Sequence, residues 1–535
     1  MRLHRNVLLF AWPFLACLAA GLSSPATAGP LPPLSVGGRV FHRLVLDNGL
    51  HAVAVADSSD SLTVFVVVAA GKRQESEAVT GVAHLTEHAL YTGTDSLAAD
   101  EHENRVKGWG GESNAFTRED YTLYYDHRFP KEHLAEVLRM EADRMRGTIF
   151  RPAAFLHEQD RLRKEEERTW QPKDELTERL EAAVYRAHNY KAGVLDGEHH
   201  TRAPELGIEA SRRFYDTYYY PNHMAVVVVG HVEPVAALQA VRDAFAPLLP
   251  GPPVPRIPRE PEVTEPRTEV LPSNLSRARV EFVWIVPGVA HPDRAKLDLL
   301  ARLIGQRSAS DSSPYICRLD ERIDPRLFRV ASTGDSASAR LEELMRDLRS
   351  RAPDRAEVDA VKQLLRDDFS GLPLRARPYF SLAGTFGVYE ALGHADLLAG
   401  YEAAIDTVGP EDLHRAVLTY LAPEQCVTVR FEPTTESLKP LPEDRKALAD
   451  AAQQAEASGD LDRAIAAYTK LLEGKPSEMF TVIYLASRGQ VRMAQHDFDG
   501  AIADFEEALG VIDYPAVRDL LEEAKALRDG RPDFD

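Results

Sequence analysis

Hydrophobic and polar residues change their spacing several times along the chain, and each change predicts a different element. Two runs rich in Val, Leu and Ala flank the turn signal Asp47-Asn48-Gly49, so we expect a β-hairpin over 39–57. Further strands are expected at 62–70, 112–118, 121–129 and 225–229. Helical spacing predicts helices at 79–92, 131–146, 152–190 and 233–248. Together these elements predict an α+β domain over residues 33–249.

A second α+β domain is expected at residues 274–433. Its first strand is predicted at 280–286 and its last at 426–431, because both runs are rich in Val and aromatic residues. Residues 250–273, between the two domains, contain eight prolines and few large apolar side chains, which predicts a stiff linker. A shorter linker rich in Pro, Thr and Glu is expected at 434–444.

The C-terminal part of the chain contains an internal repeat. Residues Gly459–Tyr468 match His496–Phe505 at an offset of 37, close to the period of a tetratricopeptide repeat. We therefore expect an all-α tail at 445–530 that resembles two tetratricopeptide units, with a capping helix at 515–528. A plain bundle of helical hairpins is the alternative.

The first residues have the pattern of an export signal. Arg2 and Arg5 precede an apolar run at 7–22, and Ala26-Thr27-Ala28 offers a small-x-small cleavage site. We expect a signal peptide at 1–28, cleavage after Ala28, and a periplasmic or secreted protein. An uncleaved anchor and a lipoprotein site at Cys17 are the alternatives. No second apolar run approaches 18 residues, so no transmembrane segment is expected in the mature chain.

Net charge, glycine motifs and cysteine content restrict the partners and the chemistry to be expected of the chain. The 535 residues carry a formal net charge of −20, which argues against nucleic acids and anionic membranes as main partners. No phosphate-binding glycine loop follows a predicted strand, so nucleotide chemistry has no support. Cys317 and Cys426, which remain after cleavage, do not make a disulfide framework, and their pairing stays open.

The sequence His84-Leu85-Thr86-Glu87-His88 is the strongest chemical signal. On a helix, two histidines four residues apart lie about 40° apart, and Glu87 shares their face. Two imidazoles one turn apart can bind one zinc ion, and the adjacent carboxylate can move a proton to or from water. A helix with two surface histidines is the alternative interpretation.

A catalytic zinc site also needs a third protein ligand and one open position. The predicted helix around 152–170 offers four acidic candidates: Glu158, Glu165, Glu166 and Glu167. Glu158 and Glu165 are seven residues apart and share a helical face. A solvated acidic helix is the alternative, and composition does not choose among the four glutamates.

With these motifs in hand, residues 38–433 resemble the pitrilysin/insulinase family of zinc peptidases, which carry an inverted H-x-x-E-H motif. The resemblance rests on His84–His88 and on four further stretches: Tyr91–Thr94, Gly110–Thr117, Tyr121–Tyr125 and Phe214–Val232. It implies two related, sandwich-like α/β domains that form half of a chamber.

The family resemblance also implies roles for individual residues. It implies a Zn²⁺ cofactor held by His84, His88 and Glu165, because the family's third ligand lies about 77 residues after the second histidine. Glu158 is then expected to orient a ligand histidine. Asn114, Ala115 and Phe116 would hold the substrate backbone along a strand edge, for which an ordinary hairpin strand is the alternative.

These inferences predict a zinc-dependent endopeptidase or oligopeptidase that acts on peptides or unfolded proteins, with Glu87 as the catalytic base. The alternative is a non-catalytic or scaffold subunit of an exported peptidase complex that binds partners through its tail. Zinc storage or transport would not explain Glu87 beside the ligands.

Full-length family members have four related domains, whereas this chain has room for two. We therefore expect a homodimer, or a heterodimer with a related chain. The partner would supply the Arg and Tyr pair with which the family holds its substrate. Within this chain, Arg375, Arg377 and Tyr379 are candidates for the pair, and the alternative is that they form a loop beside a helix.

Overall fold

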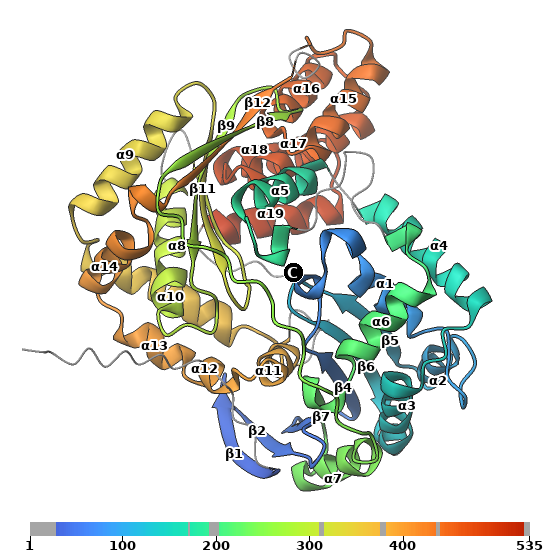
Figure 1. Cartoon of the computed structure of the whole chain (residues 1–535). Helices are drawn as coiled ribbons and strands as arrows, with labels where there is room; N and C mark the ends of the chain where they lie inside the picture. The colour runs from blue at the N-terminus through green and yellow to red at the C-terminus, as the bar shows by residue number, and fades with distance from the viewer. Residues whose placement is uncertain are drawn as a thin grey trace, which may run out of the picture.

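The computed structural model describes residues 28–169, 172–191, 203–309, 315–374, 381–434 and 439–528. They form two β-sheets, each with its own set of helices, and a helical tail (Figure 1). The predicted signal peptide, including Cys17, lies outside the described residues up to residue 27. Among the described residues, no helix combines the length and apolar character needed to cross a membrane.

The first domain contains a seven-stranded sheet in the order β1-β2-β3-β7-β4-β6-β5. The bounds are β1 Gly29–Val36, β2 Arg39–Val45, β3 His51–Ala56, β4 Ser61–Val68, β5 Glu112–Thr117, β6 Thr122–Pro130 and β7 Met224–Gly230. β7 lies at the centre, parallel to β3 and antiparallel to β4, and is buried along its whole length. A central strand covered on both faces explains its unbroken apolar sequence.

Seven α-helices belong to the described part of the first domain. They are α1 Val82–Ala89, α2 Glu101–Gly108, α3 Leu134–Gly147, α4 Pro152–Thr169, α5 Pro172–Val184, α6 Ile208–Tyr218 and α7 Pro234–Phe245. α3 and α7 pack together against one face of the sheet, while α1 lies beside α4, α6 and β5. The sheet therefore places the edge strand β5 next to the motif helix.

The second domain contains a five-stranded sheet in the order β10-β11-β9-β12-β8. The bounds are β8 Arg267–Ser273, β9 Arg279–Val286, β10 Ile316–Leu319, β11 Arg326–Thr333 and β12 Val427–Pro433. Its helices are α8 Arg294–Ala309, α9 Ala337–Ser350, α10 Arg355–Ser370, α11 Leu382–Ala391, α12 Ala395–Ala399, α13 Tyr401–Thr407 and α14 Pro410–Tyr420.

The end of the segment expected to be a linker is a strand. Residues 267–273 form β8, which pairs in parallel with β12 at the edge of the sheet, so the linker prediction is wrong for these residues. Pro266, directly before β8, and Pro272, within it, favoured the linker prediction. Proline is nevertheless tolerated in an edge strand, because one side of that strand's backbone forms no hydrogen bonds to a neighbouring strand.

Each domain contributes one helix that packs against the sheet of the other domain. α11 of the second domain packs on β7, β4 and β3 of the first. Phe386 stacks on Phe41 with ring centroids 4.0 Å apart, and Glu390 forms an ion pair with Arg43 at 2.8 Å and a hydrogen bond with His51 Nδ1 at 2.7 Å. Gly387 permits this approach, because a Cβ there would lie 2.8 Å from a Val227 methyl group.

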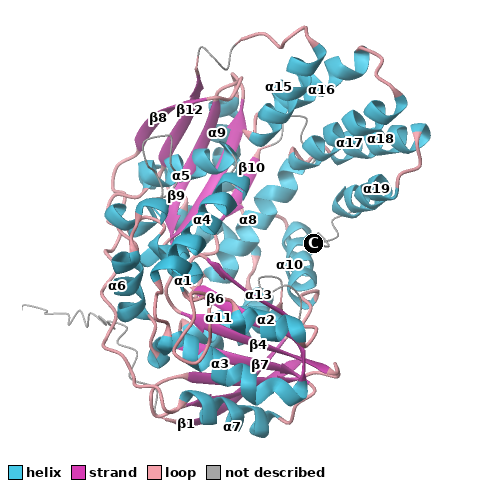
Figure 2. Ribbon diagram, turned by 90° about the vertical axis from the view of Figure 1, so that its right-hand side faces the viewer, coloured by secondary structure: helices cyan, strands magenta, loops and turns pink. Residues whose placement is uncertain are grey.

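The reverse contact is made by α5, which contacts β8 and β12 of the second sheet. Leu180 and Val184 of α5 share a buried cluster with Val283, Val427 and Phe431. Each sheet is thus partly covered by a helix from the other domain, and Figure 2 shows the two sheets at opposite ends of the two-domain body, with helices around both.

The described part of the tail contains five helices, which are α15 Arg445–Ala457, α16 Leu461–Glu473, α17 Glu478–Ala494, α18 Phe498–Val511 and α19 Pro515–Arg528. Asp460 and Asp497, at equivalent repeat positions, each cap the following helix through their side chains. The tail is anchored to the turn after β8, because Ser276 donates two hydrogen bonds to Asp460 at 2.6 and 2.9 Å. Two capped helical hairpins and a last helix are consistent with the expected repeat.

Candidate metal centre

The motif helix α1 begins at a sharp turn that is held by a buried carboxylate. Gly81 precedes the helix with a φ of 86°, a conformation that favours glycine. Glu75 accepts hydrogen bonds from the backbone N–H groups of Gly81 at 2.8 Å and Ala83 at 2.9 Å, which satisfies donors that the first turn leaves unpaired. Leu85 and Ala89, on another face of the helix, are fully buried, and their packing holds the helix in place.

Three donor groups converge beside this helix. The rings of His84 and His88 lie 5.0 Å apart, and α4 brings Glu165 between them. The Glu165 carboxylate oxygens lie 4.0 Å from His84 Nε2 and 3.7 Å from His88 Nε2, and all three donor atoms are within 4.8 Å of one another. Donor atoms bound to zinc at about 2 Å lie only slightly closer to one another than these three donor atoms do. Two imidazoles and one carboxylate are also a donor set found in catalytic zinc sites, so these residues fit the metal.

Glu158, one helical repeat before Glu165, contacts the far side of His88. Its Oε2 lies 3.2 Å from His88 Nδ1, and Arg161 donates to the same carboxylate at 3.0 Å. Burial opposes the charged form, but the hydrogen bond from His88 and the pairing with Arg161 keep the pKa of Glu158 below its ordinary value. Because a charged carboxylate can only accept, Glu158 accepts a hydrogen bond from Nδ1–H of His88, and in the neutral imidazole this leaves the Nε2 lone pair on the side of Glu165.

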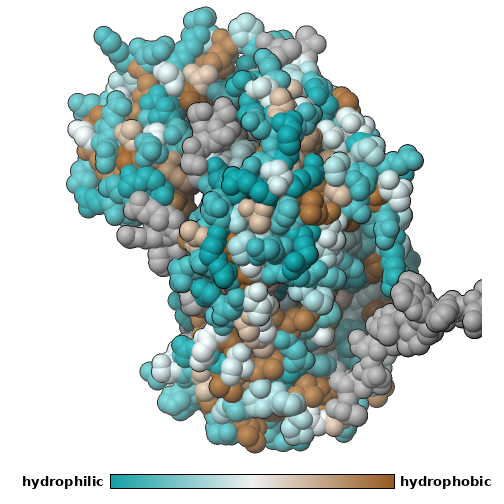
Figure 3. Space-filling model, turned by 90° about the vertical axis from the view of Figure 1, so that its left-hand side faces the viewer, coloured by the Kyte–Doolittle hydropathy of each residue, from teal (hydrophilic) through white to brown (hydrophobic). Residues whose placement is uncertain are grey.

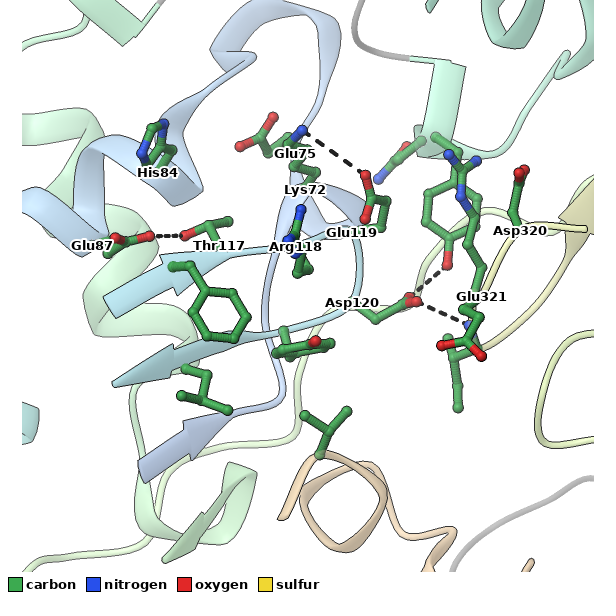
Figure 4. Close-up of a pocket in the computed structure, with 18 of the residues that line it drawn as sticks. Lys72, Glu75, His84, Glu87, Thr117, Arg118, Glu119, Asp120, Asp320 and Glu321 are labelled. Carbon is green, nitrogen blue, oxygen red and sulfur yellow. Dashed lines mark hydrogen bonds and ion pairs between the residues drawn. The ribbon is translucent and has the colours of Figure 1, made fainter. Parts of the chain in front are cut away.

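Glu87 lies on the same face of α1 but contacts a different element. Its Oε2 accepts a hydrogen bond of 2.6 Å from Thr117 Oγ1 at the end of β5 (Figure 4). Burial raises the pKa of Glu87 to about 7 in the absence of metal, a value suited to a group that both takes up and releases a proton. Sequence reasoning did not find Thr117, although the alternation of β5 places it on the same face as Ala115.

The stretch with Asn114, Ala115 and Phe116 lies in β5, the last strand of the sheet, and β5 contacts α1. The Asn114 side chain accepts a hydrogen bond from the Ala115 N–H at 2.9 Å. The Phe116 ring lies edge-on to Tyr121, with centroids 6.0 Å apart. The structure therefore places an edge strand directly beside the motif helix.

A cavity of about 1090 Å³ lies beside α1 and β5. His84, Glu87 and Glu165 line one end, and residues 320–323 and 384–392 of the second domain contribute the other side. Ten carboxylates and three Lys or Arg residues line it, so acidic side chains clearly outnumber basic ones. On the outer face seen in Figure 3, hydrophilic residues predominate and hydrophobic residues are interspersed.

A second polar cluster lies buried beside the metal centre and contains His102, Asp126, Glu141 and Arg144. His102 Nε2 lies 3.0 Å from Asp126, while Arg144 donates to both oxygens of Glu141 at 2.5 and 2.9 Å. Although three of these residues offer donor atoms close together, the guanidinium already neutralises Glu141. This cluster is a buried ion-pair network that packs α2, α3 and β6 together.

Several candidates from the sequence fall elsewhere. Glu166 lines the cavity but is not part of the three-donor group. Arg375, Arg377 and Tyr379, and the side chain of Glu167, lie outside the described residues. Cys317 and Cys426 are both free thiols; Cys317 lies in β10 and Cys426 directly before β12, and two strands separate β10 from β12.

Comparison with known proteins places this geometry in a family. Residues 52–198 match the model of insulinase, peptidase family M16, and residues 206–365 match the M16 inactive domain. The zinc protease PqqE of Helicobacter pylori is 27% identical over 432 residues, which cover 73% of this chain and 92% of that protein. The mitochondrial-processing peptidase subunit beta of Lentinula edodes is 24% identical over 445 residues, covering 75% of this chain and 90% of that protein.

Solved structures share the fold. A protease from Helicobacter pylori has a TM-score of 0.64 at 24% identity and covers 74% of this chain and 99% of its own. The periplasmic protease PqqL from Escherichia coli has a TM-score of 0.61 at 17% identity, covering 80% of this chain and 51% of its own. The two domain models of one family together match more than half of the 535 residues, and the chain belongs to the insulinase family of peptidases, M16.

Proposed function

We propose that this chain is a zinc-dependent endopeptidase or oligopeptidase. The observation that carries the proposal is the convergence of His84, His88 and Glu165 beside Glu87, at the end of a cavity bordered by an edge strand. Relatives named as zinc proteases support the same reaction class. A binding role alone would need neither the three donors nor the adjacent buried carboxylate.

The chain's own residues account for the remaining chemistry. Zinc, when bound by His84, His88 and Glu165, would polarise both the attacking water and the substrate carbonyl. Glu87 accepts one proton from that water and delivers a proton to the amide nitrogen as the carbon–nitrogen bond breaks. The outer edge of β5 is suited to bind the peptide as an additional strand through main-chain hydrogen bonds.

Removal of the metal tests this proposal. We expect the purified protein to contain one zinc ion per chain and to cleave fluorescein-labelled casein or members of a mixed peptide library. Treatment with 1,10-phenanthroline should abolish cleavage, and added Zn²⁺ should restore it, whereas added Mg²⁺ should not, because Mg²⁺ prefers oxygen donors and keeps its waters. Cleavage that persists in protein shown by mass spectrometry to be zinc-free would contradict the assignment.

We also propose that a second, related chain completes the active enzyme. The fold corresponds to about half of PqqL, whose first half alone has a TM-score of 0.61 and is matched over 98% of its length. Other relatives are named as subunits, of mitochondrial-processing peptidase and of the cytochrome b-c1 complex. The partner would be another copy, or a chain that lacks the H-x-x-E-H motif and supplies the Arg and Tyr pair.

Light scattering across a range of concentrations tests the partner proposal. We expect the active species to contain two related chains, and we expect peptide cleavage to be lost on dilution below the dissociation constant of the pair. A lone monomer that cleaves peptides at ordinary rates of about 1–10³ per second would show that one chain suffices.

Export is a further part of the proposal. Cleavage after Ala28 would leave β1, which begins at Gly29, intact as the first strand of the sheet. PqqL, which shares the fold, is a periplasmic protease. The tetratricopeptide-like tail, anchored at Ser276, would then present its helices to a peptidase partner or another exported protein.

A further inference from the structure

Among the described residues, one side-chain hydroxyl donates a hydrogen bond to the Glu87 carboxylate, at Oε2. Thr117 Oγ1 donates to Glu87 Oε2 at 2.6 Å, a length typical of a hydrogen bond from a hydroxyl to a carboxylate. Thr117 is the last residue of β5, and it faces Thr122 across the β5–β6 ladder. The two residues of the contact therefore come from different elements, a helix and a strand.

Thr117 Oγ1 has two possible acceptors for its one proton, Glu87 Oε2 and Thr122 Oγ1. Thr122 Oγ1 donates to the backbone oxygen of Ala70 at 2.9 Å, so its one proton is already used. Thr117 lies 3.3 Å from Thr122 Oγ1 but only 2.6 Å from the carboxylate, and the shorter, charge-assisted bond is the stronger one. The Thr117 hydroxyl is thus committed to Oε2, which leaves Oε1 as the oxygen that can exchange a proton.

We propose that Thr117 is a positioning residue that fixes the Glu87 carboxylate for proton transfer; this inference rests on the proposed peptidase function. Thr117 lies at the end of the strand that carries Asn114 to Phe116, the stretch expected to bind the substrate backbone. One rigid strand therefore sets both the register of the peptide and the rotamer of Glu87. Because a displacement of about 1 Å can cost on the order of 100-fold in rate, this coupling matters for turnover.

Two substitutions at position 117 and one matched control test the proposal. Thr117→Val keeps the shape but removes the hydroxyl, and we expect kcat on the casein-derived peptides to fall by about 10- to 100-fold, with KM within about two-fold and zinc content unchanged. Thr117→Ser keeps the hydroxyl and should recover most of the lost kcat. Ser113→Ala removes a buried hydroxyl from the same face of β5, one without a hydrogen-bond partner among the described residues, and should resemble the parent.

A measurement on the metal-free protein makes the test independent of activity. Urea unfolding of Thr117→Val, Glu87→Ala and the double variant forms a cycle, and we expect the two single changes to be non-additive because each removes the same bond. Additive effects, or a Thr117→Val enzyme with parental kcat, would overturn the proposal. So would an equal loss of kcat in Ser113→Ala. A parent protein that cleaves no peptide even in the presence of its partner chain would instead refute the proposed function, while the unfolding cycle would still decide whether Thr117 holds Glu87.

Discussion

Replacing Glu87 with glutamine is expected to lower kcat by about 10²- to 10⁴-fold while zinc remains bound. The amide has nearly the same shape as the carboxylate, but it cannot accept a proton from the attacking water. Glu87 is not one of the three converging donors, since its carboxylate is turned to Thr117 and the candidate donor group consists of His84, His88 and Glu165. Loss of turnover without loss of metal is therefore the signature of this residue.

The measurement compares kcat for peptide cleavage with zinc content determined by mass spectrometry on the same samples. Glu132→Gln makes the same chemical change at an exposed position far along the chain and serves as the control. Near-parental turnover in Glu87→Gln would contradict the mechanism. A variant that loses zinc together with activity would assign Glu87 to the metal rather than to the proton.

Local signals explain why much of the first domain could be predicted. The hairpin over 39–57 corresponds to β2 and β3, because Asp47-Asn48-Gly49 specifies a turn between two apolar runs. The motif helix was expected at 79–92 but spans only Val82–Ala89. A short 3-10 helix at Glu77–Val79 and the left-handed Gly81 precede it, and hydrophobic spacing alone does not reveal such a break.

Contacts between distant parts of the chain explain what the sequence could not reveal. The exchange of α5 and α11 depends on how two sheets pack, and neither helix carries a local mark of its destination. The bond between Thr117 and Glu87 joins residues 30 positions apart on a strand and a helix, so no periodicity within either element predicts it. The acidic lining of the cavity likewise combines carboxylates from separate elements, including Asp320 and Glu321 of the second domain.

The choice of Glu165 as the third metal ligand is the second prediction with a large effect. We expect Glu165→Gln to weaken zinc binding by more than about 100-fold, beyond the 10- to 100-fold range typical of residues that only orient a ligand. Its carboxylate reaches toward both histidine Nε2 atoms, at 4.0 and 3.7 Å, whereas Glu158 approaches one of these two histidines, His88, and does so at Nδ1. Glu158→Gln should therefore fall within the lower range, and His88→Ala should abolish zinc retention, because two remaining donors hold zinc poorly.

Glu166→Gln is the matched control for this series, since it changes the neighbouring residue of the same helix, which lines the same cavity but stands outside the donor group. Competition with a chromophoric zinc chelator at fixed pH gives the affinity of each variant, and fixed pH matters because the histidines must be neutral to bind. We expect Glu166→Gln to retain close to parental affinity. Equal losses at Glu165 and Glu166 would mean that acidic charge in the cavity, rather than one directed carboxylate, holds the ion, and that α4 presents a different residue to the metal.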